Sequence, residues 1–290
     1  MTSRKRTKRD FDDALEVDPP TTMFSLKGKV AVVTGGTGTL GTEFCVGLAK
    51  AGARVGVLGR KAEAGSRVVE IIEKFGGKAM FLQADVLKRE SLEKARDKVL
   101  SNWGKIDILV NGAGGNQAKA NVGPDERFFD MSTEACEKVF KLNIIGTILP
   151  TQIFGEEIAK NKLGSIVNIS SLSAKEPLTR VCGYSAAKSG VENFTKWLAT
   201  EMCHKYGCGI RCNAIAPGFF LAEQNRRLLT KPDGSLTDRG NLIIQNTPAG
   251  RFGEPHELIG ALVFLCSPAS RFVTGTVLRV DGGFGAFCGV

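Results

Sequence analysis

Hydrophobic and polar positions along the chain follow two patterns that alternate, one typical of buried strands and one typical of helices. Short runs of apolar, often β-branched residues are each followed by a stretch in which apolar residues recur every three or four positions. The runs predict seven strands, at residues 29–33, 54–58, 78–83, 106–110, 164–170, 209–215 and 276–280. The stretches between them predict helices at residues 40–50, 62–75, 89–103, 133–159, 184–206 and 254–266. This unbroken alternation predicts an α/β fold, a doubly wound parallel sheet with helices on both of its faces.

Two segments interrupt the regular pattern. The long helix predicted at residues 133–159 contains Pro150, which lacks a backbone N–H, so we expect a kink there. Residues 221–247 are polar and without period, and they predict a substrate lid spanning about 221–250. No linker divides the pattern, so residues 25–290 are expected to form a single domain.

The first 24 residues differ from the rest in composition. A basic block at residues 4–9 is followed by an acidic one at 10–18, and five Lys/Arg balance five Asp/Glu. We expect a disordered, charged extension, with a nuclear or nucleic-acid signal as the alternative. Because this extension is neutral, the whole net charge of +9 belongs to the remaining residues. A positive charge on the folded part suits anionic ligands such as phosphate or carboxylate.

Composition narrows the class of protein. With 42% hydrophobic and 24% charged residues and no apolar run long enough to cross a bilayer, the chain reads as globular, without a membrane or nucleic-acid partner. The charged N-terminus does not resemble a secretory signal, so we expect a cytoplasmic protein. The cysteine cluster Cys203, Cys208 and Cys212 lacks zinc-type spacing, which predicts reduced thiols and no metal.

The first strand runs into a glycine-rich turn that predicts a phosphate site. Four glycines lie within seven residues after the strand, and a helical pattern then begins; they are Gly35, Gly36, Gly38 and Gly41. The free N–H groups of a helix start attract anions, and glycine lets a pyrophosphate come close to the backbone. No Lys-Ser or Lys-Thr pair closes the turn, which argues against a nucleoside-triphosphatase loop. The alternative is a glycine-rich turn without a ligand.

A second group of residues predicts acid–base chemistry. Tyr184 and Lys188 are four apart on one helix face, where a nearby ammonium would lower the tyrosine pKa from about 10. Ser171 ends a strand just before this helix, where its hydroxyl could hold a substrate oxygen. Asn143 lies in the middle of the preceding long helix, and its amide either packs against backbone partners or holds a water.

Together these motifs make the chain resemble the short-chain dehydrogenase/reductase (SDR) family, in its single-domain branch, over residues 25–283. The resemblance implies a Rossmann-type fold and a catalytic tetrad of Asn143, Ser171, Tyr184 and Lys188. Tyr184 would exchange a proton with the substrate oxygen, Lys188 would lower the Tyr184 pKa and hold the nicotinamide ribose, and Asn143 would support a water. The cofactor residues that it implies, besides Tyr184 and Lys188, are Gly35, Thr37, Gly38, Thr39, Leu40, Gly41, Arg60, Asp85, Val86, Asn111, Ala113, Gly114, Pro217 and Gly218.

The sequence departs from the family pattern at three positions. Thr39 stands where the family usually has glycine, with Gly38 one position earlier, and Ala222 stands where a threonine often contacts the carboxamide. Arg60 follows the second strand, where members that prefer NAD carry an acidic residue. An arginine would attract a 2′-phosphate, so NADP(H) is favoured over NAD(H); alternatively Arg60 stacks on the adenine and both cofactors work.

A narrower resemblance concerns the substrate. Residues 216–226 and 246–253 are similar to sugar-acid members of the family, of the D-mannonate (fructuronate) oxidoreductase and gluconate 5-dehydrogenase types. We expect substrate contacts from Ser173, Asn116 and Arg226; further candidates are Arg227, Arg180 and Gln117. Alternatives are a reductase of ketones or acyl-carrier 3-ketoesters, and a cofactor-binding protein without turnover. Homodimers or homotetramers are expected from the resemblance.

Overall fold

Seven strands form one parallel sheet in the computed structural model, which describes residues 19–221, 226 and 228–289. Its strand order is β3-β2-β1-β4-β5-β6-β7. The strands are β1 (Val30–Thr34), β2 (Arg54–Gly59), β3 (Lys78–Gln83), β4 (Ile108–Asn111), β5 (Leu163–Ile169), β6 (Gly209–Pro217) and β7 (Val277–Val280). The sequence-based prediction of the fold class is confirmed. Strand order reverses between β1 and β4, so the loops at their carboxyl ends diverge there and leave a crevice.

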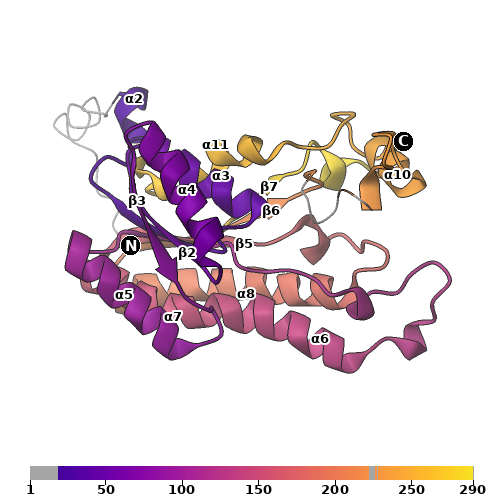
Figure 1. The fold of residues 1–290 in the computed structure, drawn as a ribbon, viewed down its shortest axis with the longest axis horizontal. Coiled ribbons are helices and arrows are strands. Elements are labelled where there is room, and N and C mark those ends of the chain that lie inside the picture. Colours follow the sequence, from indigo (N-terminus) through magenta and orange to yellow (C-terminus); the bar gives the residue numbers. More distant parts are fainter. Residues whose placement is uncertain (1–18, 222–225, 227, 290) are drawn as a thin grey trace, which may run out of the picture.

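Helices cover both faces of the sheet (Figure 1). One layer holds α3 (Thr39–Lys50), α4 (Ala62–Lys74) and α11 (Ile259–Cys266), and the opposite layer holds α5 (Arg89–Trp103), α7 (Gly146–Lys160) and α8 (Cys182–Lys205). Each layer encloses its own apolar core. Phe44 and Leu262 contribute to the first and Phe154 and Met202 to the second, which explains why the strands read as continuous apolar runs. No helix within the described ranges is long and apolar enough to span a membrane.

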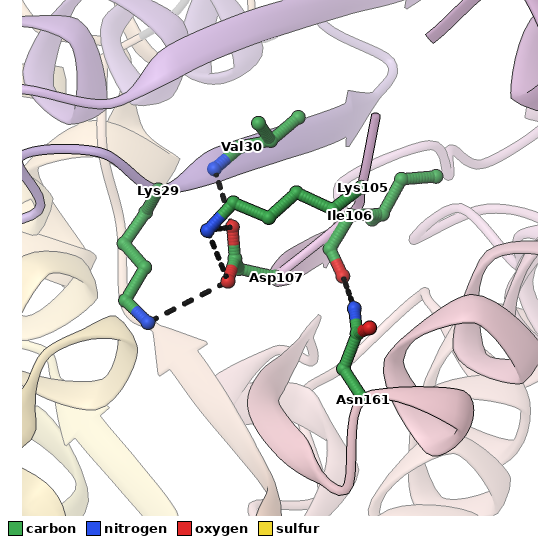
Figure 2. Close-up of polar contacts among 6 residues, drawn as sticks. All are labelled: Lys29, Val30, Lys105, Ile106, Asp107 and Asn161. Carbon is green, nitrogen blue, oxygen red and sulfur yellow. Dashed lines mark hydrogen bonds and ion pairs between the residues drawn. The ribbon is translucent and has the colours of Figure 1, made fainter. Parts of the chain in front are cut away.

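Polar contacts join β1 to β4 at their amino ends (Figure 2). The buried carboxylate of Asp107 accepts hydrogen bonds from the Val30 N–H (2.9 Å) and from Lys105 Nζ (3.1 Å), and it pairs with Lys29 Nζ at 3.5 Å. Asn161 at the end of α7 donates to the carbonyl of Ile106 at 3.4 Å. These contacts fix the β1–β4 pair from the end opposite the crevice.

The long helix predicted at residues 133–159 is present but contains one wide turn. It consists of α6 (Thr133–Phe140), a π-helical turn at Lys141–Ile145, and α7. Pro150 lies inside α7, and the departure from the regular α-helix occurs earlier, at the turn that carries Asn143. π-turns of this kind often occur at functional sites.

Two other segments differ from the prediction. The polar stretch 221–247 was expected to be irregular, yet α10 (Asp238–Gln245) forms within it, because Thr237 caps the helix by accepting a hydrogen bond from the Gly240 N–H at 3.1 Å. The end of the predicted disordered extension forms a short helix, α2 (Pro20–Met23), and Phe24 packs against Phe264 with ring centroids 6.4 Å apart. Residues 1–18 of that extension lie outside the described residues.

Candidate active site

A cleft of about 460 Å³ opens at the carboxyl ends of the strands, over the crevice between β1 and β4. It is lined by residues from the loops after β1, β2, β3, β4, β5 and β6, which converge because parallel strands all end on the same edge. All the predicted cofactor residues except Asn111 line it, together with Ser171. One continuous surface therefore joins the glycine turn to the predicted acid–base group.

The turn between β1 and α3 forms the floor of the cleft. Gly35 has a φ of +67°, and a Cβ there would lie 2.8 Å from the Ala113 nitrogen; a Cβ on Gly41 would overlap the Gly35 carbonyl oxygen. Gly38 precedes the first helical residue, Thr39, and its carbonyl accepts from the Thr42 N–H at 2.8 Å. The turn thus forms despite the shifted glycine. It offers a helix start with no side-chain cap from the described residues, and so fits a pyrophosphate.

The far end of the cleft carries the features of a nucleotide site. Arg60 is exposed there, immediately after β2, and Asp85 and Val86 follow β3 beside it. The Asp85 carboxylate accepts the Leu87 N–H at 2.9 Å, so its own turn orients it. Arg60 puts a positive charge where a ribose phosphate would lie if the pyrophosphate sat on the glycine turn.

Three side chains of the predicted tetrad meet at the other end. Lys188 is buried, and its Nζ donates to the Ile169 carbonyl at 2.7 Å while lying 5.5 Å from the centre of the Tyr184 ring. The Tyr184 hydroxyl is hydrogen-bonded to Ser171. Ser171 is held in turn by Ser173, whose N–H and hydroxyl donate to its Oγ at 3.2 and 3.1 Å. Hydroxyl, phenol and ammonium thus share one partly water-excluded corner.

The pKa values in this corner differ from the sequence-based expectation. Burial raises the pKa of Tyr184 to about 12, and the hydrogen bond to Ser171 only partly offsets this. Burial also lowers the pKa of Lys188 to about 8. The expected lowering of the Tyr184 pKa is not seen in this structure, because desolvation of the phenolate outweighs the influences that favour it. At neutral pH Tyr184 is therefore a proton donor.

Asn143 is buried at the wide turn of the long helix and serves the backbone. Its Nδ2 donates to the carbonyls of Gly115 (2.7 Å) and Val139 (2.8 Å), and its Oδ1 accepts the Gly115 N–H at 3.3 Å. Of the two alternatives open at the sequence level, the structure shows the one with backbone partners. Asn143 fixes the loop after β4 that forms one wall of the cleft.

Asn111, which was predicted to contact the cofactor, lies apart from the residues that line the cleft. Its buried side chain does not line the cleft; its Nδ2 donates to Thr151 Oγ1 and Asn168 Oδ1, both at 2.9 Å. Asn168 donates onward to Thr195 Oγ1 at 2.9 Å. These contacts tie β4 and β5 to α7 and α8, because polar groups buried beneath the site need partners within the protein.

The predicted substrate residues do not come together in the cleft as the predicted cofactor residues do. Ser173 is buried behind Ser171, and Asn116 is exposed and donates to Asn121 Oδ1 at 2.8 Å; neither lines the cleft. Arg226 is exposed, and its carbonyl accepts the Thr230 N–H at 2.7 Å. Arg180 and Gln117 are exposed on loops at the same edge of the sheet. Arg227 and Ala222 lie outside the described residues.

Sequence reasoning missed several apolar residues that line the cleft, among them Leu142, Phe219 and Phe220. Leu142 comes from the wide helical turn, and Phe219 and Phe220 follow the Pro217–Gly218 turn. The Phe219 ring meets Phe284 edge-on, with centroids 5.1 Å apart. Phe219 and Phe220 follow directly after a strand end, and this position could have marked them as cleft residues. Aromatic residues at such a position are equally typical of the hydrophobic core.

Comparison with known proteins identifies what this site resembles. The family model described as short chain dehydrogenase matches residues 29–233. UxuB of Bacillus subtilis, an uncharacterised oxidoreductase, is 45% identical over 275 residues, covering 92% of this chain and 98% of that protein. A Haemophilus influenzae structure with bound NAD, itself only proposed to be a D-mannonate oxidoreductase, has a TM-score of 0.85 and 42% identity over 92% of this chain and 98% of that one. A gluconate 5-dehydrogenase from Burkholderia cenocepacia, in complex with NADP and tartrate, has a TM-score of 0.82 and 30% identity over 92% and 99%.

Proposed function

Since the chain belongs to the short-chain dehydrogenase family and is therefore an oxidoreductase acting on CH–OH groups, we propose that it interconverts a sugar acid and its keto form with NADP(H). The substrate would be of the D-mannonate/D-fructuronate or gluconate type. The observation that carries this proposal is the corner where Ser171, Tyr184 and Lys188 meet at the inner end of a cleft floored by glycine backbone.

The chain's own residues do the acid–base work. When bound, the nicotinamide supplies or accepts the hydride. Ser171 holds the substrate oxygen, and Tyr184, protonated at neutral pH, delivers its proton to that oxygen as the carbonyl is reduced. Lys188 places a positive charge beside the phenol and stabilises the tyrosinate left behind. The raised Tyr184 pKa favours reduction at neutral pH and oxidation at alkaline pH.

The cofactor preference rests on Arg60. Its exposed guanidinium at the end of β2 suits a 2′-phosphate, which a carboxylate at the same place would repel. Residues from the glycine turn would hold the pyrophosphate, and Asp85 and Val86 would flank the adenine. The Haemophilus relative holds NAD and the Burkholderia relative holds NADP, so the relatives do not decide between the two cofactors. The proposed preference for NADP(H) therefore depends on Arg60.

The sugar-acid class is supported by relatives and by charge. The two solved relatives described above are named for sugar acids, and the second one holds tartrate, a hydroxy acid. A net charge of +9 suits anionic substrates. The alternative substrate, an acyl-carrier 3-ketoester, requires recognition of an acidic carrier protein and is a separate arm of the test.

Absorbance at 340 nm tests the proposal. Purified protein is mixed with NADPH or NADH and with D-fructuronate, 5-ketogluconate or a 3-ketoacyl thioester, beside Tyr184→Phe. We expect oxidation of NADPH with at least one sugar acid, and none with Tyr184→Phe, which should still bind NADPH in a fluorescence titration. Turnover of thioesters alone would refute the sugar-acid assignment, and cofactor binding without any turnover would refute catalysis.

We also propose a homodimer or homotetramer, paired through the layer of α6, α7 and α8. On α8, Trp197 is 56% exposed and stacks against Phe194 with ring centroids 6.2 Å apart, a large apolar surface for a free monomer. Light scattering of the wild type and of Trp197→Glu tests this: a wild type that elutes as a monomer would refute it.

A further inference from the structure

Two arginines, one on the loop before α8 and one at the start of α10, lie close enough for their charges to interact. Arg239 lies in the first turn of α10, and its Nη1 donates to Thr179 Oγ1 at 3.4 Å, directly beside Arg180. Arg180 lies four residues before Tyr184, so their Cα atoms are at most about 14 Å apart. Its carbonyl accepts the Val122 N–H at 2.9 Å, which joins the loops after β4 and β5 at this point.

Three features of this arrangement disfavour two positive charges and would be relieved by a bound anion. Burial lowers the pKa of the half-buried Arg239, and the positive charge of Arg180 lowers that pKa further. Arg239 also stands near the positive end of the α10 dipole, where a cation is disfavoured. Arg180 holds a φ of +77°, a conformation that costs a non-glycine residue energy.

No acidic partner offsets these two charges among the described residues. No described carboxylate lies within 4.0 Å of either guanidinium. Glu176, on the same loop as Arg180, pairs with Arg279 at 3.1 Å instead. Asp238 precedes Arg239 but is exposed in the first turn of α10.

We propose that Arg180 and Arg239 form a carboxylate clamp that binds the acid group of the substrate while Ser171 and Tyr184 hold its reacting oxygen. This inference rests on the proposed sugar-acid function and identifies the residues that select for it. A sugar acid carries its carboxylate away from its reacting carbon, so a carboxylate site separate from the Ser171–Tyr184 corner suits it. Two guanidiniums can share a carboxylate through several N–H donors, and the negative charge between them offsets their mutual repulsion.

The clamp is tested by comparing a charged with a neutral substrate. Initial rates are measured for the wild type, Arg180→Ala, Arg239→Ala and Arg239→Lys, with the sugar acid that the wild type reduces and with the neutral ketose D-fructose at high concentration. We expect each alanine variant to lose about 10- to 100-fold in kcat/KM for the acid, mostly through KM, and to change less than about twofold for the ketose. Arg239→Lys should recover part of the loss.

Controls separate the clamp from folding and from the proposed function. Arg67→Ala removes an exposed arginine of α4, paired with Glu63 at 3.5 Å, and should change neither substrate. Circular dichroism and the Kd for NADPH should be unchanged in all variants. A wild type that reduces no sugar acid refutes the proposed function and the clamp together. A wild type that does so, with alanine variants equal to it or equally impaired for both substrates, refutes the clamp alone.

Discussion

Removing the charge of Lys188 should make the free protein more stable while it abolishes turnover. Burial lowers the Lys188 pKa from 10.5 to about 8, a difference of about 2.5 units, which corresponds to about 3 kcal/mol of penalty for the charged form. In Lys188→Met the penalty disappears, and the apolar stem is replaced by one of similar volume. The Ile169 carbonyl loses its donor, which costs about 1 kcal/mol. The net expectation is a gain of about 2 kcal/mol at pH 7.

The pH dependence gives this prediction its sign. At pH 7 the lysine is charged in the folded and in the unfolded chain, so the folded state carries the full penalty. Above about pH 8 the folded state releases the proton, whereas the unfolded chain keeps it up to about 10.5. The free energy of unfolding of the wild type should therefore rise between pH 8 and 10.5, as the penalty for the charged lysine disappears. The stability advantage of Lys188→Met should shrink over the same range.

Urea denaturation at pH 7 and pH 10, followed by circular dichroism, measures both effects. Lys196→Met is the matched control, since Lys196 is exposed on the same helix and its removal should change stability by less than about 0.5 kcal/mol. If Lys188→Met is less stable than the wild type at pH 7, or if its advantage does not depend on pH, the account of a buried charged lysine is wrong.

Three further predictions concern the cleft. Arg60→Asp should reverse the cofactor preference, lowering kcat/KM for NADPH about 100-fold and raising it for NADH; an unchanged ratio would show that Arg60 does not read the 2′-phosphate. Gly41→Ala should unfold the turn or abolish NADPH binding, whereas Gly38→Ala, whose Cβ would meet its nearest neighbour at 3.4 Å, should keep the wild-type melting temperature; equal effects in calorimetry would contradict the packing argument. Asn143→Asp should cost at least about 2 kcal/mol in urea, because an acceptor would then face two backbone carbonyls; a neutral effect would exclude the role in fixing the cleft wall.

Much of the fold could be predicted from the sequence because the two hydrophobic periods are unusually clear. The fully buried strands read as continuous apolar runs, such as Val30–Thr34, and the helices between them show one apolar stripe. The helix at Asp238–Gln245 was missed because only three of its eight residues, Leu242, Ile243 and Ile244, are apolar, and the cap at Thr237 was not recognised.

The site was predictable in its members but not in its electrostatics. Spacing places Tyr184 and Lys188 on one helix face, but it cannot tell how deeply that face is buried, and burial reverses the expected direction of the Tyr184 pKa. Asn111 illustrates the same limit. The family resemblance implies a cofactor contact for Asn111, and only its three-dimensional neighbours Thr151 and Asn168 show that it supports the sheet.

The wide turn at Lys141–Ile145 separates the rotational phase of α6 from that of α7. An ordinary α-helix advances about 100° per residue, so one residue more or fewer would turn all that follows by that amount. The π-turn absorbs one residue relative to a regular helix, and so it sets which face of α7 presents Thr151 to Asn111 of β4. The length of this segment therefore matters more than its composition. Deleting one residue there would restore a regular α-helix but would rotate α7 relative to the sheet.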